Sequence, residues 1–294
     1  MMASAFAKIA CVGLGQMGLP MAKHLVAAGF PVTGFDLSQQ ALEQFRLAGG
    51  KTVSSITDAL SSADCVITML PSGKIVQDVL LGGGAALVGA KDTALIIDMS
   101  SSAPSDTRAL QKMLPHHQRL VDAPVSGGVK RAIDGSLAIM VGGADADIDQ
   151  AQPLLEKMSA KIFRCGPVGA GHAMKAINNY VSGTSVIAAV EAVQLGKAFG
   201  LDPENMIDVL NASSGKNNAT DVKMKQFVLS GTYSSGFGLG LMAKDIRIAA
   251  ELSKSLGLEQ LQLQEVADTW DAAAKAIGGT ADHTKIAEYL GKSK

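Results

Sequence analysis

The chain has 294 residues, of which 47% are hydrophobic and 18% charged, and its formal net charge is −1. This balance is typical of a globular protein and argues against an intrinsically disordered one. Because no stripe of Lys or Arg stands out, nucleic acid and membranes are not expected as partners. Small molecules and copies of the same chain are the expected partners.

Three cysteines, Cys11, Cys65 and Cys165, lie far apart, each in or beside a short apolar run. This odd set predicts neither a disulfide framework nor a metal site, and we expect buried, reduced thiols and a cytoplasmic location. The N-terminus lacks the pattern of a signal peptide, and no apolar run approaches the roughly 20 residues that span a bilayer.

Short apolar runs alternate with amphipathic, helix-length segments through the first half of the chain. The segment Met17–Ala28, for example, predicts a helix that ends at Gly29. Continuous apolar runs separated by helices are typical of parallel strands covered on both faces. The predicted strands are Ile9–Val12, Val32–Phe35, Cys65–Leu70, Leu95–Asp98, Leu120–Ala123, Leu137–Val141 and Ile162–Cys165.

The pattern changes at Gly166–Gly169, after which strand-like runs disappear. The stretch His172–Phe199 predicts one long helix, and the rest predicts further helices with breaks at glycines. We therefore predict an α/β, Rossmann-like, doubly wound sheet in residues 1–166. Residues 167–294 are predicted to form an all-α substrate and dimerisation domain that begins with a long interdomain helix.

The first candidate site is the turn Gly13-Leu14-Gly15-Gln16-Met17-Gly18, which follows a predicted strand and opens a predicted helix. In this pattern the first glycine permits a tight turn and the second lets a pyrophosphate approach the backbone. The third allows strand and helix to pack closely. The spacing predicts a dinucleotide site, whereas a glycine-rich structural turn is the alternative.

Asp36 ends the second predicted strand and supports that interpretation. A carboxylate at this point accepts both hydroxyls of the adenosine ribose and repels a 2′-phosphate. No Arg within Leu37–Leu42 offers a clamp for such a phosphate. We therefore expect NAD rather than NADP as the cofactor.

Three further segments contain candidate catalytic or binding residues. Ser126-Gly127-Gly128 can present a hydroxyl and unhindered N–H groups to a carboxylate, although a plain tight turn is the alternative. If helical, residues 169–179 place Lys175 and Asn179 on one face, one turn apart. Lys175 then faces an interdomain cleft or, alternatively, extends into solvent as a surface lysine. Lys244 follows a glycine-rich loop and is locally typical of a solvated side chain.

Four segments, taken in order along the chain, resemble the 3-hydroxyacid dehydrogenase family. They are GLGQMGLPMA at 13–22, DAPVSGG at 122–128, the G-x-G-x3-K-x3-N pattern from Gly169 to Asn179, and Lys244-Asp245. This family includes 3-hydroxyisobutyrate dehydrogenase, tartronate semialdehyde reductase and L-threonate dehydrogenase. The resemblance spans residues 8 to about 290. Its specific parts are the DAPVSGG segment and the Lys/Asn helix, since many oxidoreductases share the glycine turn.

The resemblance implies an NAD-dependent dehydrogenase in which Lys175 is the catalytic residue. It implies that Ser126, Gly127 and Gly128 hold the substrate carboxylate and that Asn179 orients the reacting hydroxyl. Leu70, Pro71 and Ser101 fall on nicotinamide-side contacts, and Lys244 on a lysine that closes over the cofactor. A homodimer or homotetramer, assembled through the helical domain, is also implied.

The expected mechanism follows from these roles. As hydride leaves for the nicotinamide, the neutral Lys175 amine accepts the hydroxyl proton, and in reduction it returns that proton. A lysine works as a base near neutral pH only where burial or a second cation disfavours its charged form, and Lys244 is a candidate for that cation. A primary alcohol would give a semialdehyde, and a secondary alcohol would give a keto acid that can lose carbon dioxide.

Several alternatives remain at this point. Reduction of a small semialdehyde acid uses the same residues, whereas a non-catalytic NAD-binding protein has no need for Lys175, Asn179 and Ser126 together. 6-Phosphogluconate dehydrogenase is disfavoured because its chain is much longer. Imine reductases are disfavoured because they replace the catalytic lysine, whereas this chain has Lys175. Hydrolase chemistry is disfavoured because Ser126 is not in a GxSxG sequence.

The pair Asp282-His283 is interpreted as a helix cap or as a contribution to a neighbouring subunit's site. The particular hydroxy acid and the physiological direction are not encoded in recognisable motifs.

Overall fold

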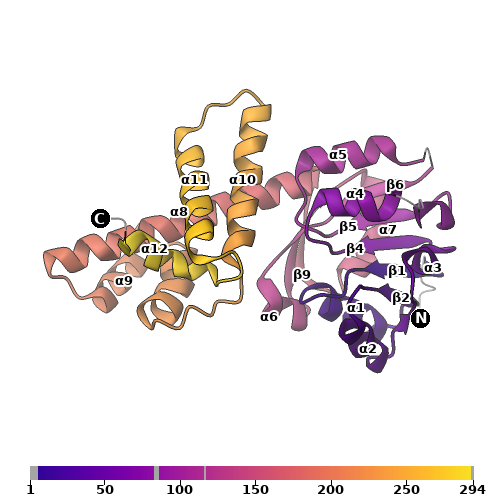
Figure 1. Ribbon diagram of the computed structural model, residues 1–294, viewed down its shortest axis with the longest axis horizontal. Helices are drawn as coiled ribbons and strands as arrows, with labels where there is room; N and C mark the ends of the chain where they lie inside the picture. The colour runs from indigo at the N-terminus through magenta and orange to yellow at the C-terminus, as the bar shows by residue number, and fades with distance from the viewer. Residues whose placement is uncertain (1–5, 83–85, 116, 293–294) are drawn as a thin grey trace. The chain divides into compact units, whose positions relative to one another are not determined.

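The computed structural model describes residues 6–82, 86–115 and 117–292, and its chain divides into two compact units. The first unit is Met1–Lys175 and the second is Ala176–Lys294 (Figure 1). No helix in the described part of the chain is both long enough and apolar enough to cross a membrane.

The first unit is built around a nine-stranded sheet in the order β3-β2-β1-β4-β5-β6-β8-β7, with β9 paired to β8. From β3 to β6 in this order each strand runs parallel to the next, and the strand order reverses between β1 and β4. In sheets of this kind ligands bind beyond the carboxyl ends of the strands at such a reversal. The strands are β1 (Ile9–Val12), β2 (Val32–Phe35), β3 (Lys51–Thr52), β4 (Cys65–Thr68), β5 (Leu95–Asp98), β6 (Arg119–Asp122), β7 (Val125–Ser126), β8 (Leu137–Gly142) and β9 (Ser159–Gly166).

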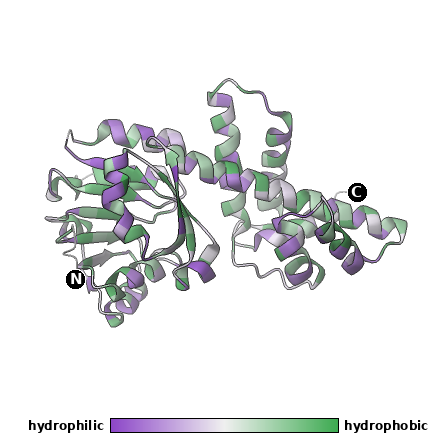
Figure 2. Ribbon diagram, turned by 180° about the vertical axis from the view of Figure 1, so that it is seen from behind, coloured by the Kyte–Doolittle hydropathy of each residue, from purple (hydrophilic) through white to green (hydrophobic). Residues whose placement is uncertain are grey.

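Helices cover both faces of this sheet, and the central strands bury apolar side chains on both sides. Ile9 and Cys11 belong to one buried cluster and Ala10 to another, because successive side chains of β1 point to opposite faces. Figure 2 shows the same apolar strands in green. The connecting helices are α1 (Gly18–Ala27), α2 (Gln39–Leu47), α3 (Ile56–Leu60), α4 (Gly73–Leu81), η1 (Ala86–Gly89), α5 (Pro104–Met113), α6 (Gly128–Ile133) and α7 (Asp145–Leu155).

The second unit is helical, and Trp270 lies fully buried in its core. Its longest helix, α8 (Ala170–Phe199), begins in the first unit. The helix α10 packs on α11, as Figure 1 also shows. The remaining elements are α9 (Pro203–Ala212), the π-helix η2 (Ala219–Leu229), α10 (Leu239–Ser255), α11 (Leu261–Ile277), η3 (His283–Lys285) and α12 (Ile286–Lys292).

The predicted fold class is confirmed, but two details of the sequence interpretation are wrong. The sheet is not wholly parallel, because β8 runs antiparallel to β6 and β7. Only the short helix α6 separates β7 from β8, and a parallel connection needs a crossover of a dozen or more residues. The second error concerns Cys165, which is partly exposed because β9 is largely exposed. Cys11 and Cys65 are buried and free, and burial raises the pKa of the Cys11 thiol to about 12.

Candidate active site

The turn between β1 and α1 is packed so closely that two of its positions require glycine. Gly13 has a φ of +94°, and a Cβ there would lie 2.3 Å from the carbonyl oxygen of Met69. A Cβ on Gly18 would lie 2.0 Å from the carbonyl oxygen of Gly13. At Gly15, by contrast, no atom lies within 4 Å of the position that a Cβ would take. A pyrophosphate therefore has room to approach the main chain beside the amino end of α1, and the turn fits a dinucleotide.

Asp36 is held at the end of β2 by two backbone N–H groups. Leu14 N donates to its Oδ2 at 2.6 Å and Ser38 N donates to its Oδ1 at 2.8 Å. Each carboxylate oxygen can still accept a second hydrogen bond, such as one from a ribose hydroxyl. Leu14 uses its N–H on Asp36, and its side chain is buried. Gln16 is exposed and Met17 is half-buried on the way into α1.

A buried carboxylate, Asp98, organises the loops that follow β4 and β5. Its Oδ1 accepts hydrogen bonds from Thr68 Oγ1 at 2.9 Å and from Ser100 N at 3.1 Å. Its Oδ2 accepts one from Ser102 Oγ at 2.9 Å. The Ser100 hydroxyl in turn accepts the N–H of Leu70 at 2.9 Å. These bonds fix the two loops that carry the predicted nicotinamide-side contacts.

The residues predicted to contact the nicotinamide side follow β4 and β5 at the carboxyl edge of the sheet. Leu70 and Ser101 are half-buried, and Pro71 is exposed. The parallel register aligns Thr68 with Asp98, so the two loops leave adjacent strands at the same level. The structure thus brings the predicted residues of this group together.

The turn between β7 and α6 contains the residues predicted to hold a carboxylate. Gly127 has a φ of +135° and Gly128 a φ of +68°, both of which favour glycine. No atom lies within 4 Å of the Cβ position at Gly128, and Ser126 is only half-buried. The turn therefore combines the backbone conformation and the open space that an anionic ligand requires.

Lys175 lies in the second turn of α8 and is only 9% exposed. Its Nζ donates a hydrogen bond to the carbonyl oxygen of Val125 at 2.9 Å. Val125 immediately precedes Ser126, so the amine lies beside the strand that leads into the glycine turn. The alternative of a solvated surface lysine is therefore wrong.

Asp122 holds the beginning of α8, a role that the sequence interpretation missed. Its Oδ1 accepts the N–H of Gly169 at 2.7 Å and its Oδ2 accepts that of His172 at 2.8 Å. The carboxyl group thus caps the helix that carries Lys175. Burial raises the pKa of the Asp122 carboxyl, while His172 and the N–H donors act in the opposite direction. A sequence signal existed, because Asp98 and Asp122 each end an apolar strand.

In the second unit, Asn179 lies one turn beyond Lys175 on α8 and is 7% exposed. Its Nδ2 donates to Asp245 Oδ2 at 2.6 Å. Lys244 Nζ lies 3.7 Å from Asp245 Oδ1, with 29% of the side chain exposed. Asp245 therefore connects two predicted site residues within this unit, and Lys244 is not simply solvated.

A second buried polar cluster of the helical unit surrounds His283. Asp282 caps η3 through Thr284 N, which confirms the helix-cap interpretation. The His283 Nδ1 lies 2.9 Å from Ser235 Oγ and 3.2 Å from the Phe237 carbonyl oxygen, while Nε2 has no hydrogen-bond partner among the described residues. Burial, followed by the charge of the nearby Lys223, lowers the pKa of His283 to about 4.

Comparison with known proteins decides which family this site belongs to. Residues 8–166 match the family model of the NAD-binding domain of 6-phosphogluconate dehydrogenase. Residues 169–290 match the model described as NAD-binding of NADP-dependent 3-hydroxyisobutyrate dehydrogenase. The chain is 38% identical over 248 residues to 2-(hydroxymethyl)glutarate dehydrogenase of Eubacterium barkeri, covering 84% of this chain and 82% of the relative. The chain belongs to the 3-hydroxyacid dehydrogenase family.

Two further members support this assignment. The NAD-dependent L-serine dehydrogenase of Pseudomonas aeruginosa is 37% identical over 255 residues, covering 84% of this chain and 86% of that protein. The structure of Mycobacterium tuberculosis 3-hydroxyisobutyrate dehydrogenase with L-serine is similar with a TM-score of 0.89 at 34% identity, covering 96% of this chain and 98% of that one. The predicted family, fold class and nicotinamide-dependent oxidoreduction of hydroxy acids are thereby confirmed.

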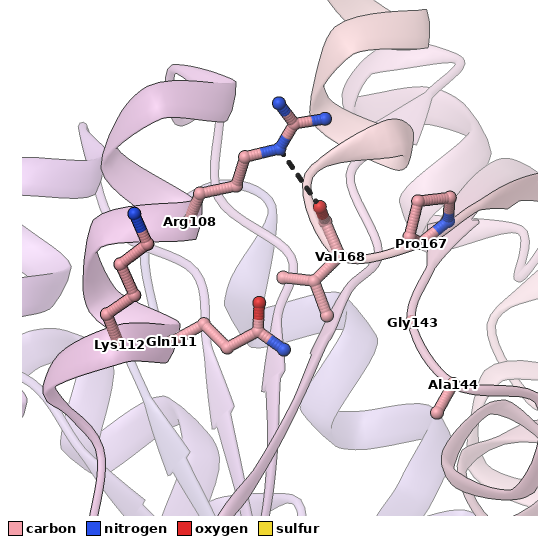
Figure 3. Close-up of a pocket in the computed structure, with 7 residues that line it drawn as sticks. All are labelled: Arg108, Gln111, Lys112, Gly143, Ala144, Pro167 and Val168. Atoms are coloured by element: carbon pink, nitrogen blue, oxygen red, sulfur yellow. Dashed lines mark hydrogen bonds between the residues drawn. The ribbon is translucent and has the colours of Figure 1, made fainter.

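Within residues 6–82, 86–115 and 117–292, no group of three or more His, Cys, Asp or Glu side chains could hold a metal ion. A surface hollow of about 460 Å³ lies between α5 and the segments that precede α7 and α8 (Figure 3). It contains none of the predicted site residues, and its lining is Arg108, Gln111, Lys112, Gly143, Ala144, Pro167 and Val168.

Proposed function

We propose that this 3-hydroxyacid dehydrogenase transfers hydride between NAD and a small 3-hydroxy acid, with Lys175 as the general acid and base. The observation that carries the proposal is the placement of a buried lysine amine 2.9 Å from the Val125 carbonyl, next to the glycine turn. Lysine side chains are rarely this buried in proteins. A buried amine beside this turn therefore favours a role in proton transfer over a purely structural one.

The proposed roles follow the chemistry of each group. The N–H groups of Gly127 and Gly128 and the Ser126 hydroxyl bind the substrate carboxylate, and Asn179 orients the reacting hydroxyl. The bound nicotinamide supplies the hydride acceptor. Lys175 accepts the hydroxyl proton during oxidation and returns it during reduction. Asp245 positions Asn179 through the bond between the amide Nδ2 and the carboxylate.

The proposed cofactor is NAD rather than NADP. The two backbone N–H groups that bind Asp36 keep its carboxylate at the end of β2. A carboxylate at this point accepts ribose hydroxyls and repels a 2′-phosphate. The residues proposed to contact the dinucleotide are Gly13, Leu14, Gly15, Gln16, Met17, Gly18, Asp36, Leu70, Pro71, Ser101 and Lys244.

The proposed substrate class is a 3-hydroxy acid whose alcohol is primary. Relatives are named for 2-(hydroxymethyl)glutarate, L-serine and 3-hydroxyisobutyrate. Each of these acids has a hydroxymethyl group on the carbon that bears its carboxylate. Oxidation of such an alcohol gives a semialdehyde acid, and the reverse reaction is the reduction of that semialdehyde by the same residues.

We also propose the domain roles, the location and the assembly. Residues 1–166 bind the dinucleotide, and residues 167–294 contribute to substrate binding and to a homodimer or homotetramer in the cytoplasm. Several large apolar side chains of α8 are exposed, which favours self-association. These are Ile177, Val181, Leu195 and Phe199.

The test is NADH formation by the purified protein with a panel of 3-hydroxy acids, repeated with NADP. We expect turnover of acids with a hydroxymethyl group next to the carboxylate, and a higher kcat/KM with NAD. Binding of NADH without turnover of any acid or semialdehyde in the panel would contradict the proposal and favour a non-catalytic NAD-binding protein.

A further inference from the structure

Two buried carboxylates stand next to each other at the carboxyl edge of the sheet. Asp98 ends β5, Asp122 ends β6, and the parallel register pairs these two residues directly. Both are at most 1% exposed. Each organises a different part of the site, because Asp98 binds the loops after β4 and β5 whereas Asp122 caps α8.

The first turn of α8 rests directly on the main chain of the sheet. A Cβ on Gly171 would lie 2.4 Å from the carbonyl oxygen of Met140 and 2.9 Å from Asp122 Oδ2. A Cβ on Gly142 would lie 2.6 Å from Asp122 Oδ1 and 2.8 Å from Gly171 N. At these two glycines no Cβ separates the helix from the sheet.

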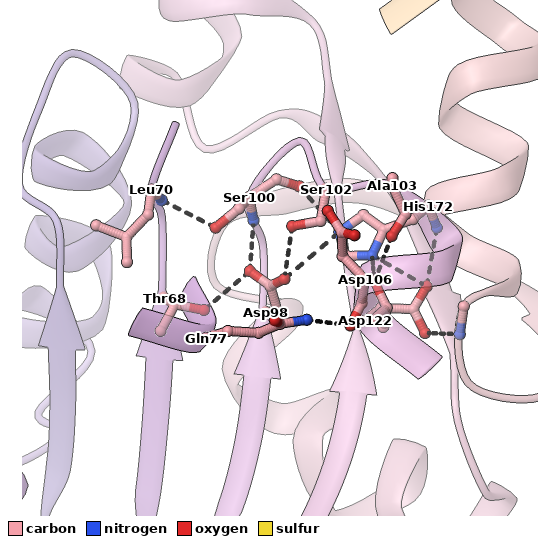
Figure 4. Close-up of polar contacts among 12 residues, drawn as sticks. Thr68, Leu70, Gln77, Asp98, Ser100, Ser102, Ala103, Asp106, Asp122 and His172 are labelled. Carbon is pink, nitrogen blue, oxygen red and sulfur yellow. Dashed lines mark hydrogen bonds and ion pairs between the residues drawn. The ribbon is translucent and has the colours of Figure 1, made fainter. Parts of the chain in front are cut away.

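His172 connects the two carboxylate-centred groups (Figure 4). Its backbone N–H binds Asp122, while its ring Nε2 lies 3.0 Å from the Ser100 carbonyl oxygen. Because a carbonyl oxygen only accepts hydrogen bonds, Nε2 carries a proton. Nδ1 lies 2.8 Å from the Thr107 hydroxyl on α5. The ring is fully buried, with Asp122 Oδ2 3.6 Å from Nδ1 and Asp98 Oδ2 3.8 Å from Nε2.

The His172 ring and Asp98 therefore both bond to the same residue, Ser100. Ser100 donates its N–H to Asp98, its hydroxyl oxygen accepts the N–H of Leu70, and its carbonyl oxygen accepts a hydrogen bond from the His172 ring. Three residues along α8 from His172, Lys175 reaches Val125. A continuous series of hydrogen bonds and helix backbone thus runs from the loop with Leu70 to the lysine amine.

We propose that His172 is a positioning residue that fixes the helix carrying Lys175 against the nicotinamide-side loops. The ring bonds to Ser100 and Thr107, so it acts on the reaction through the helix that carries Lys175. It sets the position of the lysine amine relative to the loops on which the nicotinamide is proposed to lie. This inference rests on the proposed catalytic role of Lys175.

The size of the expected effect follows from the demands of proton and hydride transfer. A displacement of about 1 Å at reacting groups can lower a rate about 100-fold. In His172→Phe the ring volume is kept but both ring hydrogen bonds are lost. We expect kcat to fall about 10- to 100-fold, with the Kd of NADH and the KM of the hydroxy acid changed by less than about threefold.

Two companion variants separate positioning from general packing. In His172→Gln the side-chain amide can still donate to the Ser100 carbonyl, so we expect most of kcat to be recovered. Leu110→Ala removes a buried side chain from α5 outside the hydrogen-bond network. It is expected to lower the Tm without lowering kcat per folded protein at 25 °C.

A measurement without cofactor gives an independent readout. Hydrogen exchange of peptides that cover the first turn of α8 is expected to be faster in His172→Phe than in the parent protein, and unchanged in Leu110→Ala. If His172→Phe does not fold, Thr107→Val replaces it, because the substitution keeps the shape and removes only the hydroxyl bonded to Nδ1. We expect it to lower kcat about fivefold.

Lys175→Ala, assayed in parallel, separates failure of this inference from failure of the proposed function. If Lys175→Ala is inactive while His172→Phe keeps a normal kcat and normal exchange, the positioning role is overturned and the catalytic role stands. If Lys175→Ala keeps its rate, the proposed mechanism is overturned and His172 has no catalytic lysine to position. Equal losses of kcat in His172→Phe and Leu110→Ala would mean that the effect is only one of stability.

Discussion

Lys175 donates a hydrogen bond from Nζ to the main-chain carbonyl oxygen of Val125, 2.9 Å away. The two residues are fifty positions apart in the sequence. Since Val125 leads directly into Ser126, this bond fixes the amine beside the turn proposed to bind the substrate carboxylate. The position of the lysine amine relative to that turn is thus set by the fold.

Replacement of this amine is the most direct test of the mechanism. Lys175→Met keeps the length and the apolar stem of the side chain but removes the proton acceptor. We expect kcat to fall by about 10²- to 10⁴-fold, the usual contribution of a general acid or base, with little change in the Kd of NADH. Lys197→Met on an exposed position of the same helix is the matched control and should keep full activity. Near-normal turnover by Lys175→Met would rule out the proposed role.

Cofactor choice can be tested at Asp36. Asp36→Asn keeps the shape of the side chain and removes the negative charge that repels a 2′-phosphate. We expect the ratio of kcat/KM for NAD to that for NADP to fall about tenfold, mainly through a lower KM for NADP. Glu43→Gln, an exposed charge removal on α2, should leave the ratio unchanged. An unaltered preference in Asp36→Asn would show that this carboxylate does not contact the ribose.

The proposed carboxylate turn can be tested at Gly128. Gly128→Ala adds a methyl group at a φ of +68° where no protein atom lies within 4 Å. Gly257→Ala is its matched control, with a φ of +71° and equally open surroundings in another turn. Both variants should lose about 1 kcal/mol of stability from backbone strain. Only Gly128→Ala is expected to raise the KM of the hydroxy acid, by about tenfold or more, because the methyl group occupies the space of the carboxylate. Equal KM values in the two variants would place the substrate elsewhere.

Acid sensitivity is predicted at His283. The pKa of this ring is about 4 in the folded chain and about 6.5 as an ordinary side chain. Since folding favours the neutral form, this contribution to stability is complete above pH 6.5 and is lost as the pH falls toward 4. The linked loss is about 3 kcal/mol. The unpartnered Nε2 is consistent with this lowered pKa, because a proton there would have no acceptor among the described residues.

Urea unfolding followed by the fluorescence of Trp270 measures this effect. Trp270 is the only tryptophan of the chain, is fully buried, and stacks on the His283 ring with the centroids 6.3 Å apart. We expect the urea midpoint to fall between pH 6.5 and 4 in the parent protein and in the exposed-site control His117→Asn. The midpoint should fall less in His283→Asn. Parallel pH curves for all three proteins would contradict the prediction.

Much of the fold could be predicted because hydrophobic runs have clear limits. The runs Ile9–Val12, Val32–Phe35 and Leu95–Asp98 coincide with strands to the residue. The two-residue strands β3 and β7 were missed, since a pair of residues has no periodicity and is defined only by its partner strand. Strand direction was also missed at β8, because an apolar run has the same pattern in either orientation.

The site shows the same division between local and long-range information. Glycines and helical periodicity are visible in short segments, so the turns at Gly13 and Gly128 and the helical position of Lys175 could be predicted. The contacts of Asp122 and His172 are made to residues far away in sequence. Their function depends on strand register and on where α8 begins, neither of which a local pattern specifies.

The close approach of Gly171 to the Met140 carbonyl and of Gly142 to Asp122 affects how the chain tolerates substitution. Main-chain atoms are the same whatever side chains surround them, so a helix start that rests on them keeps its place when other positions change. The start of α8, and with it the support of the Lys175 amine, therefore depends little on which side chains surround it. A substitution elsewhere in the chain can change what the protein recognises and still leave this support in place.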